Sequence, residues 1–324
     1  MLAEHPDLRF AFSRPGFITF KETSDEGPEL ELKREIFTRL WGVVIAQTRD
    51  PAALPELLAS IPAGSFVQAF DRDEFVPGDE IEGFARNAHI AKILAGRADI
   101  TLSEGKPTPG KPVFSLIWVD DFHVFIGRHT PRARQLATAG NLFATPLPAH
   151  APSRAWLKLE EAIARFNPPS EKGWKALEIG SAPGGATTAL LDRGFAVTGI
   201  DPQFMDPRVV AREGFTHIRK PTRFVTAAEL AGCNPDWLVM DMSVAPGDAL
   251  GELSHLLGEL RANFGKSLKI RKAFLTLKLT DWKYAQDIPS WLKRLEKEGF
   301  QDLKAIQLAS NRQEFLVYAA GFRA

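Results

Sequence analysis

The stretch Ala176-Leu177-Glu178-Ile179-Gly180-Ser181-Ala182-Pro183-Gly184-Gly185 joins a short apolar run to three glycines and a proline. A helical pattern follows over residues 187–191. This order predicts a strand, a tight turn and a helix N-terminus, where backbone N–H groups can approach a ligand closely. Glycine suits such a turn because it has no Cβ to block the turn or the ligand.

An acidic residue stands at the end of the next apolar run. Residues 195–200 read as a strand, and Asp201 follows directly. A carboxylate in this place can accept hydrogen bonds from both hydroxyls of a ribose. A glycine turn alone would also suit an ordinary connection in an α/β protein, but together with Asp201 it favours nucleoside binding.

Strand and helix patterns alternate through the second half of the chain. The expected strands are 176–179, 195–200, 216–218, 237–240 and 273–279, and the expected helices are 187–192, 207–212, 227–230, 248–264 and 285–297. This alternation predicts an α/β fold, a Rossmann-like doubly wound sheet with ligands at the carboxyl ends of its strands. Two last strands, 300–308 and 315–320, are joined by a short turn and must pair antiparallel.

Four ionisable residues lie at informative places in this pattern. Asp241 follows the fourth strand, Lys278 lies within the apolar fifth strand, and Glu314 opens the last strand. A lysine in an apolar strand is costly unless it reaches a site or a partner, and pairing with Asp241 alone is the structural alternative. Lys158 lies at the edge of the apolar stripe of a helix over 154–166, for which Ser153 is the expected N-cap.

The proline-bearing stretch 141–152 reads as a linker, which divides the chain into domains 1–150 and 151–324. The first domain reads as an α+β unit, with strands at 10–12 and 17–20, a helix at 30–40 and a hairpin over 113–126. It contains no catalytic set, and its 16 Lys/Arg against 20 Asp/Glu make it acidic, whereas the second domain is basic. We expect the first domain to be a binding module.

Composition limits the class of protein. The 324 residues include one cysteine, so neither an intrachain disulfide nor a cysteine-rich metal site is expected. No apolar run approaches the length of a membrane span and the N-terminus has no signal-peptide pattern, so we expect a cytoplasmic protein. The basic run 261–272 could contact phosphates or be an ordinary solvated surface.

The sequence resembles the FtsJ-type ribose 2′-O-methyltransferases in a set of residues that occur in the same order: Lys158, Gly180 to Gly185, Asp201, Asp241, Lys278 and Glu314. The resemblance covers residues 153–320 and implies S-adenosylmethionine as cofactor and RNA as substrate, with a cytidine of large-subunit ribosomal RNA as the target and no metal. It implies a monomer whose N-terminal domain is THUMP-like. The catalytic set would be Lys158, Asp241, Lys278 and Glu314; the cofactor would contact Ser153, Gly180, Ser181, Ala182, Pro183, Gly184, Gly185, Asp201 and Asp241.

The sequence departs from the family pattern at two places. Ala186 stands where the family commonly has an aromatic residue, and Arg219-Lys220 stands where it often has an acid near the adenine.

The sequence is also compatible with two other functions. A nicotinamide-dependent oxidoreductase would also use Asp201, although the glycine spacing differs from its usual motif. A non-catalytic RNA-binding protein could keep the fold without the reaction.

Overall fold

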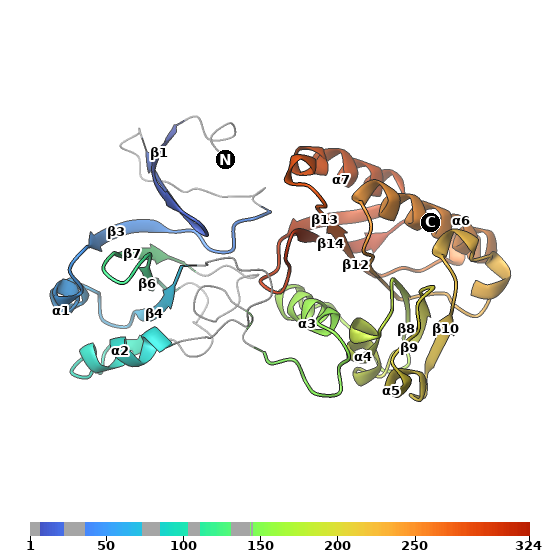
Figure 1. Cartoon of the computed structure of the whole chain (residues 1–324), viewed down its shortest axis with the longest axis horizontal. Coiled ribbons are helices and arrows are strands. Elements are labelled where there is room, and N and C mark those ends of the chain that lie inside the picture. The colour runs from blue at the N-terminus through green and yellow to red at the C-terminus, as the bar shows by residue number, and fades with distance from the viewer. Residues whose placement is uncertain (1–6, 23–35, 73–84, 103–110, 131–142, 144) are drawn as a thin grey trace. The chain divides into compact units, whose positions relative to one another are not determined.

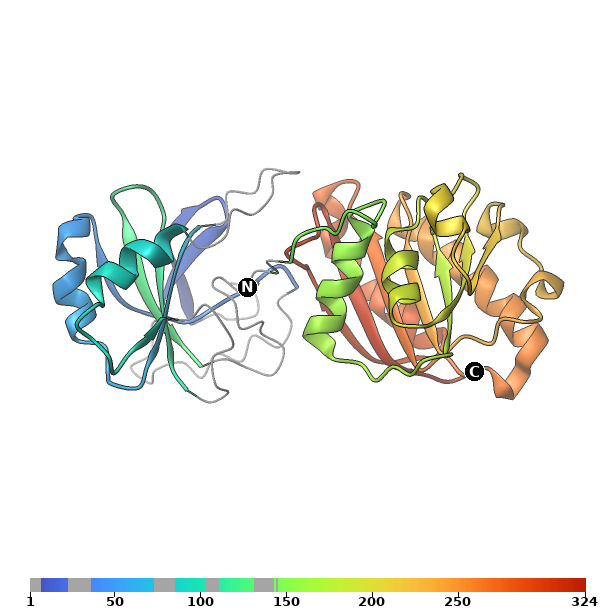
Figure 2. The ribbon, with the colours of Figure 1, turned by 90° about the horizontal axis from the view of Figure 1, so that it is seen from below.

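The computed structural model describes residues 7–22, 36–72, 85–102, 111–130, 143 and 145–324. The chain divides into two compact units, Met1–Ala144 and Thr145–Ala324. Figure 1 and Figure 2 show the strands and helices of each unit. Each unit has its own apolar core.

The first unit is an α+β structure, as the sequence predicts. The strands β1 (Leu8–Arg14) and β2 (Phe17–Glu22) form a hairpin, and a second sheet has the order β3-β7-β6-β4-β5. That sheet consists of β3 (Val43–Thr48), β4 (Phe66–Asp71), β5 (Thr101–Leu102), β6 (Val113–Trp118) and β7 (Val124–His129), with helices α1 (Leu54–Ala59) and α2 (Ala85–Ile93).

The helix predicted over 30–40 is wrong in its described part. Residues 36–40 adopt bends, whereas residues 30–35 lie outside the described residues. The predicted hairpin is present as β6 and β7, which pair antiparallel, although β7 begins two residues later than expected and extends to His129. The core of this unit packs Leu54, Ile90 and Leu116 between the helices and the sheet.

The second unit is the predicted Rossmann-like sheet. Its order is β10-β9-β8-β11-β12-β14-β13, and the first five strands are parallel. The strands are β8 (Lys175–Ile179), β9 (Ala196–Ile200), β10 (Phe215–Ile218), β11 (Trp237–Asp241), β12 (Lys272–Lys278), β13 (Phe300–Ile306) and β14 (Glu314–Phe322). The helices are α3 (Ala155–Phe166), α4 (Gly185–Asp192), α5 (Pro207–Val210), α6 (Pro246–Phe264) and α7 (Ile288–Lys297).

Aromatic contacts fix α3 against the sheet. A chain of ring contacts crosses one face of the sheet, from Phe195 through Trp237 and Phe274 to Tyr318. The successive ring centroids are 4.7, 5.1 and 5.3 Å apart. The ring of Phe166, at the end of α3, stacks on Tyr318 at 4.3 Å. Burial of these large rings gives α3 a defined place on the sheet, and the polar edge of this helix carries Lys158.

The last strands are arranged so that β14 lies between β12 and β13. It pairs antiparallel with both neighbours, and Lys278 faces Glu314 in the register with β12. Because β14 runs opposite to the parallel strands, its first residue lies where β12 ends. The fold therefore brings the start of β14 to the carboxyl ends of β11 and β12.

Candidate active site

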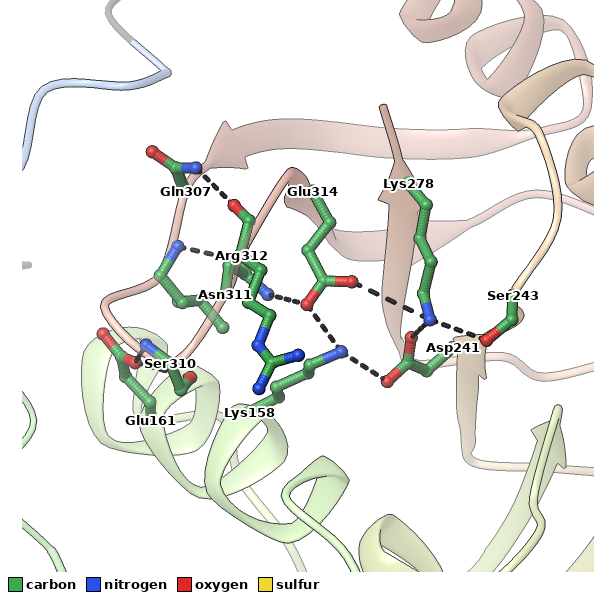
Figure 3. A network of polar contacts seen from close by, with 11 residues as sticks. Lys158, Glu161, Asp241, Ser243, Lys278, Gln307, Ser310, Asn311, Arg312 and Glu314 are labelled. Carbon is green, nitrogen blue, oxygen red and sulfur yellow. Dashed lines mark hydrogen bonds and ion pairs between the residues drawn. The ribbon is translucent and has the colours of Figure 1, made fainter. Parts of the chain in front are cut away.

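Lys158, Asp241, Lys278 and Glu314 lie together at the carboxyl ends of the parallel strands (Figure 3). The Nζ atom of Lys158 lies 2.9 Å from Asp241 Oδ2 and 2.6 Å from Glu314 Oε1. Lys278 Nζ lies farther from both carboxylates, 3.8 Å from Asp241 Oδ1 and 4.0 Å from Glu314 Oε2. The sequence also allowed Lys278 to form a simple pair with Asp241. The structure instead places Lys278 near both carboxylates of a four-residue cluster.

The two lysines have different surroundings. The Lys158 side chain is 16% exposed and is held by two short ion pairs, whereas that of Lys278 is 27% exposed and donates its hydrogen bond to Ser243 Oγ at 2.8 Å. The pKa of Lys158 is lowered by burial, but the charges and hydrogen bonds of Asp241 and Glu314 outweigh this effect and raise it overall. Lys158 therefore stays protonated at neutral pH.

Asp241 keeps an acceptor atom available. Its Oδ1 is buried and has no hydrogen-bond partner among the residues that the structure describes. A buried acceptor of this kind is costly unless a ligand or water satisfies it. Asp241 can therefore receive a donor that enters the site between the two lysines.

The turn after β8 uses its glycines for packing as well as for conformation. Gly180 and Gly184 have φ angles of +79° and +116°, which L side chains rarely adopt. A Cβ on Gly180 would lie 2.6 Å from the carbonyl oxygen of Asp241, and one on Gly184 would lie 2.8 Å from Val209 Cγ2. The chain thus keeps these glycines because protein atoms approach them; close approach of a ligand is not needed to explain them.

Ser153 does not cap α3 as the sequence pattern predicts. Arg154 is the N-cap residue, with no side-chain hydrogen bond, and the Ser153 Oγ is buried without a described partner. This oxygen packs against Gly185, the first residue of α4. The serine therefore stands beside the N-terminus of α4, where the first backbone N–H groups of a helix have no intrahelical acceptor.

Asp201 follows β9 and faces the glycine turn. Its Oδ2 accepts a hydrogen bond from the Ala182 N–H at 3.1 Å, and its Oδ1 accepts one from the Gln203 N–H at 2.8 Å. The side chain is only partly buried, so its remaining lone pairs are accessible. Asp201 and the N-terminus of α4 fit an adenosine-bearing cofactor with a charged amino-acid part. The oxygens of Ser153 and Asp241 that have no hydrogen-bond partner fit the same ligand.

The basic residues after β10 have partners of their own. Arg219 stacks on the exposed ring of Phe204, with 3.4 Å from its guanidinium carbon to the ring centroid, and Lys220 pairs with Glu229 at 2.6 Å. Phe204 comes from the segment just after Asp201. Arg219 and Lys220, which occupy the positions after β10, therefore both contact other side chains of this unit.

The basic run 261–272 does not line this site. Lys272 begins β12, whereas Lys278 ends it, so the run lies at the amino end of the strand. Lys269 and Arg271 pair with Asp236, and Arg261 pairs with Glu298. The phosphate contacts suggested for this run would therefore lie at the amino end of the sheet, away from the four clustered residues.

Glu178 is a residue of interest that the sequence reasoning did not single out. It is 2% exposed in the middle of β8 and accepts a hydrogen bond from Thr187 Oγ1 at 2.6 Å. Burial raises the pKa of Glu178 to about 8, the Thr187 hydrogen bond opposes the shift, and the charges of Asp241 and Asp201 add to it. The sequence contained a signal for Glu178, an ionisable residue inside an apolar strand, which is the same signal that identified Lys278.

Within the described residues, no group of three or more His, Cys, Asp or Glu is arranged to hold a metal ion. None of the helices in those same parts of the chain combines the length and the apolar composition that crossing a bilayer requires.

The chain is similar to curated proteins named ribosomal RNA large subunit methyltransferase M. The protein of Tolumonas auensis is 27% identical over 95% of this chain and 88% of the relative. That of Idiomarina loihiensis is 28% identical over 90% and 79%. That of Halorhodospira halophila is 34% identical over 72% of this chain and 65% of the relative.

The family model of the FtsJ-like methyltransferases matches residues 151–320, which is the unit that carries the four clustered ionisable residues. This match agrees with the resemblance inferred from the sequence motifs and excludes the reading as a nicotinamide-dependent oxidoreductase. The chain belongs to the FtsJ-like methyltransferase family.

Proposed function

We propose that this chain transfers the methyl group of S-adenosylmethionine to a ribose 2′-hydroxyl of large-subunit ribosomal RNA. The observation that carries the proposal is the cluster of Lys158, Asp241, Lys278 and Glu314 at the carboxyl ends of β11 and β12. The similarity to ribosomal RNA large subunit methyltransferase M supports RNA as the substrate class. The full cluster also speaks against a non-catalytic relict of the fold.

The cofactor would lie along the turn after β8. Asp201 would accept hydrogen bonds from the ribose hydroxyls, and the N–H groups at the start of α4 would face the amino-acid part. Ser153 Oγ and Asp241 Oδ1 would gain the hydrogen-bond partners that they lack. When bound, S-adenosylmethionine supplies an electrophilic methyl group on a sulfonium. The chain must then hold a hydroxyl oxygen in line with that methyl group and manage its proton.

Lys278 is the residue that we assign to the 2′-hydroxyl. It is the more exposed lysine, and its hydrogen bond to Ser243 is one that a substrate hydroxyl can replace. A neutral Lys278 amine would accept the hydroxyl proton, and the proton would remain on its Nζ until product release. Asp241 and Glu314 then stabilise the ammonium that forms.

Lys158 has a supporting role in this scheme. Its two short ion pairs orient Asp241 and Glu314, and its raised pKa keeps it cationic. It also attracts the oxygen as negative charge develops on it.

The first unit would select the RNA and take no part in the chemical step. This division follows from the absence of a catalytic set among its described residues and from its separate core. Arg128 is an exposed candidate contact; Arg132 and Arg134, which the sequence also suggests, lie outside the described residues. Recognition by shape suits a domain in which acidic residues outnumber basic ones.

The test is methyl transfer to large-subunit ribosomal RNA that lacks this modification, with radiolabelled S-adenosylmethionine. A 2′-O-methyl group removes the nucleophile of alkaline RNA cleavage, so the labelled product should survive hydrolysis as an alkali-resistant dinucleotide. Label in a mononucleotide would place the methyl group on a base and contradict the proposal. Label that is absent from RNA with wild-type enzyme, but present with a small-molecule acceptor, would replace the substrate class.

A further inference from the structure

The loop from 307 to 313, which joins β13 to β14, is ordered by side-chain contacts. Asn311 is 3% exposed; its Oδ1 accepts a hydrogen bond from the Leu308 N–H at 2.8 Å, and its Nδ2 donates one to Glu314 Oε1 at 3.3 Å. The Gln307 side chain donates a hydrogen bond to the Arg312 carbonyl at 2.8 Å. The loop thus has a fixed backbone and touches one of the four clustered residues directly.

The same loop is anchored on the helix that carries Lys158. Glu161, one turn farther along α3, is fully buried. It accepts hydrogen bonds from the Ala309 N–H, the Ser310 N–H and Ser310 Oγ at 2.9, 2.8 and 2.7 Å, and it pairs with Arg165. A buried carboxylate whose lone pairs are all used is a rigid attachment. Lys158 and the loop are therefore held in one frame (Figure 3).

Arg312 is the residue that this frame presents to solvent. Its side chain is exposed, and no acidic group in the described residues pairs with it. In Figure 3 it extends from the loop on the side of Lys158. An arginine on an otherwise well-anchored loop beside the site can bind a planar or tetrahedral anion with two parallel hydrogen bonds.

The charge of the four-residue cluster does not by itself attract a phosphate, so a further cation such as Arg312 has a role. With Lys158 protonated, both carboxylates ionised and Lys278 neutral, as its proposed role requires, the cluster carries a net negative charge before proton transfer. A ribose whose 2′-hydroxyl reaches Lys278 carries a phosphodiester on the adjacent 3′ carbon, so the substrate brings a negative charge to the rim. The cluster itself offers no net positive charge to balance the phosphate.

We propose that Arg312 binds the phosphodiester that flanks the target ribose and so sets the 2′-hydroxyl against Lys278. This inference rests on the proposed function, because it requires an RNA substrate. It assigns to Arg312 a contact with substrate and to Glu161 and Asn311 the positioning of that contact. The arginine would discriminate a ribose within an RNA strand from a free nucleoside.

The experiment compares full-length Arg312→Gln and Arg312→Lys with wild type. Lys297→Gln is the control, because it removes an exposed positive charge at the end of α7, just before β13 begins at the amino end of the sheet. RNA dissociation constants are measured over a series of salt concentrations, together with kcat, the KM for RNA and the affinity for S-adenosylmethionine. Loss of one phosphate contact lowers the slope of log affinity against log salt by about 0.7 to 0.9.

The expected result is a reduced slope and a KM for RNA raised about tenfold in Arg312→Gln, with cofactor affinity unchanged. Arg312→Lys should keep the slope and lose part of the affinity, because lysine retains the charge without the fork of donors. Lys297→Gln should match wild type in KM. A wild-type slope in Arg312→Gln, or a loss of cofactor affinity in that variant, would overturn the inference. Wild-type enzyme that binds RNA without methylating it would instead overturn the proposed function.

Discussion

Lys158 Nζ lies 2.6 Å from Glu314 Oε1, and this contact joins the first helix of the methyltransferase unit to its last strand. The contact exists because β14 runs antiparallel to β12 and places its first residue at the carboxyl end of that strand. Two side chains from opposite ends of the sequence of this unit therefore share one buried ion pair. Lys158 also forms an ion pair with Asp241, so one ammonium group holds two carboxylates in place.

Removing Lys158 should destabilise the fold. Lys158→Met leaves two largely buried carboxylates with Lys278 as their remaining cation at 3.8 and 4.0 Å, so we expect a loss of about 3 kcal/mol in the free energy of unfolding. Urea unfolding measures this loss. The double variant Lys158→Met/Glu314→Gln should recover much of it, since one uncompensated charge is gone. A double variant no more stable than the single one would show that the ion pair is not the cause.

Lys278 should be needed for methyl transfer and dispensable for cofactor binding. We expect Lys278→Ala to lower kcat by about a thousandfold while S-adenosylmethionine binds nearly normally, because the lysine acts in the transition state. Lys278→Arg should fail as well, since arginine stays protonated. Single-turnover kinetics and calorimetry separate the two effects. Most of the activity surviving in the arginine variant would exclude proton acceptance by this residue.

Glu178 should make the stability of the protein depend on pH. Its pKa is about 8 in the folded state and near 4.5 when unfolded, so unfolding releases a proton between these values. The stabilisation is complete below about pH 4.5 and is lost as pH rises toward 8, with a slope of at most about 1.4 kcal/mol per pH unit. Glu178→Gln should remove this slope in urea unfolding at pH 5.5 and 7.5. The exposed Glu296→Gln is the control and should leave the slope as in wild type.

Asp201 should carry much of the cofactor affinity. Asp201→Ala is expected to weaken S-adenosylmethionine binding between ten- and a hundredfold, because charged hydrogen bonds to the ribose are lost. Asp206→Ala removes a nearby carboxylate that binds Arg208 and should leave the affinity unchanged. Isothermal calorimetry provides both values. Equal affinities in the two variants would remove Asp201 from the cofactor site.

The sequence predicted the parallel strands well, most clearly β8, β9 and β11, because each of these three is a short apolar run that a glycine or an acid closes. It did not predict which of the last two strands lies inside the sheet, although a signal was present. Residues 315–320 form an unbroken apolar run, as expected of a strand buried on both faces, whereas β13 carries Gln301, Asp302 and Lys304. Only this order places Glu314 beside Lys278.

Other parts of the site had weaker signals or none. Ser153 has the residue type of an N-cap, but tertiary packing against Gly185 decides its position. Ser243 reaches Lys278 through a loop that no periodicity describes. The run 261–272 is basic in sequence, but sequence does not reveal that its charges pair with Asp236 and Glu298 at the amino end of the sheet.

The two units should separate cofactor binding from RNA selection. A segment of residues 145–324 contains the whole Rossmann-like sheet with its own core, so we expect it to fold and to bind S-adenosylmethionine with the affinity of the full chain. It should not methylate the native RNA, because the selecting contacts would lie in the first unit. The measurement is calorimetry with the cofactor and label transfer to RNA for both proteins. Methylation of the same nucleotide by the segment at the full-length rate would sink this division of roles, since the catalytic unit would then recognise its RNA alone. Loss of cofactor binding in a segment that is still folded would show that the first unit also supports the catalytic one.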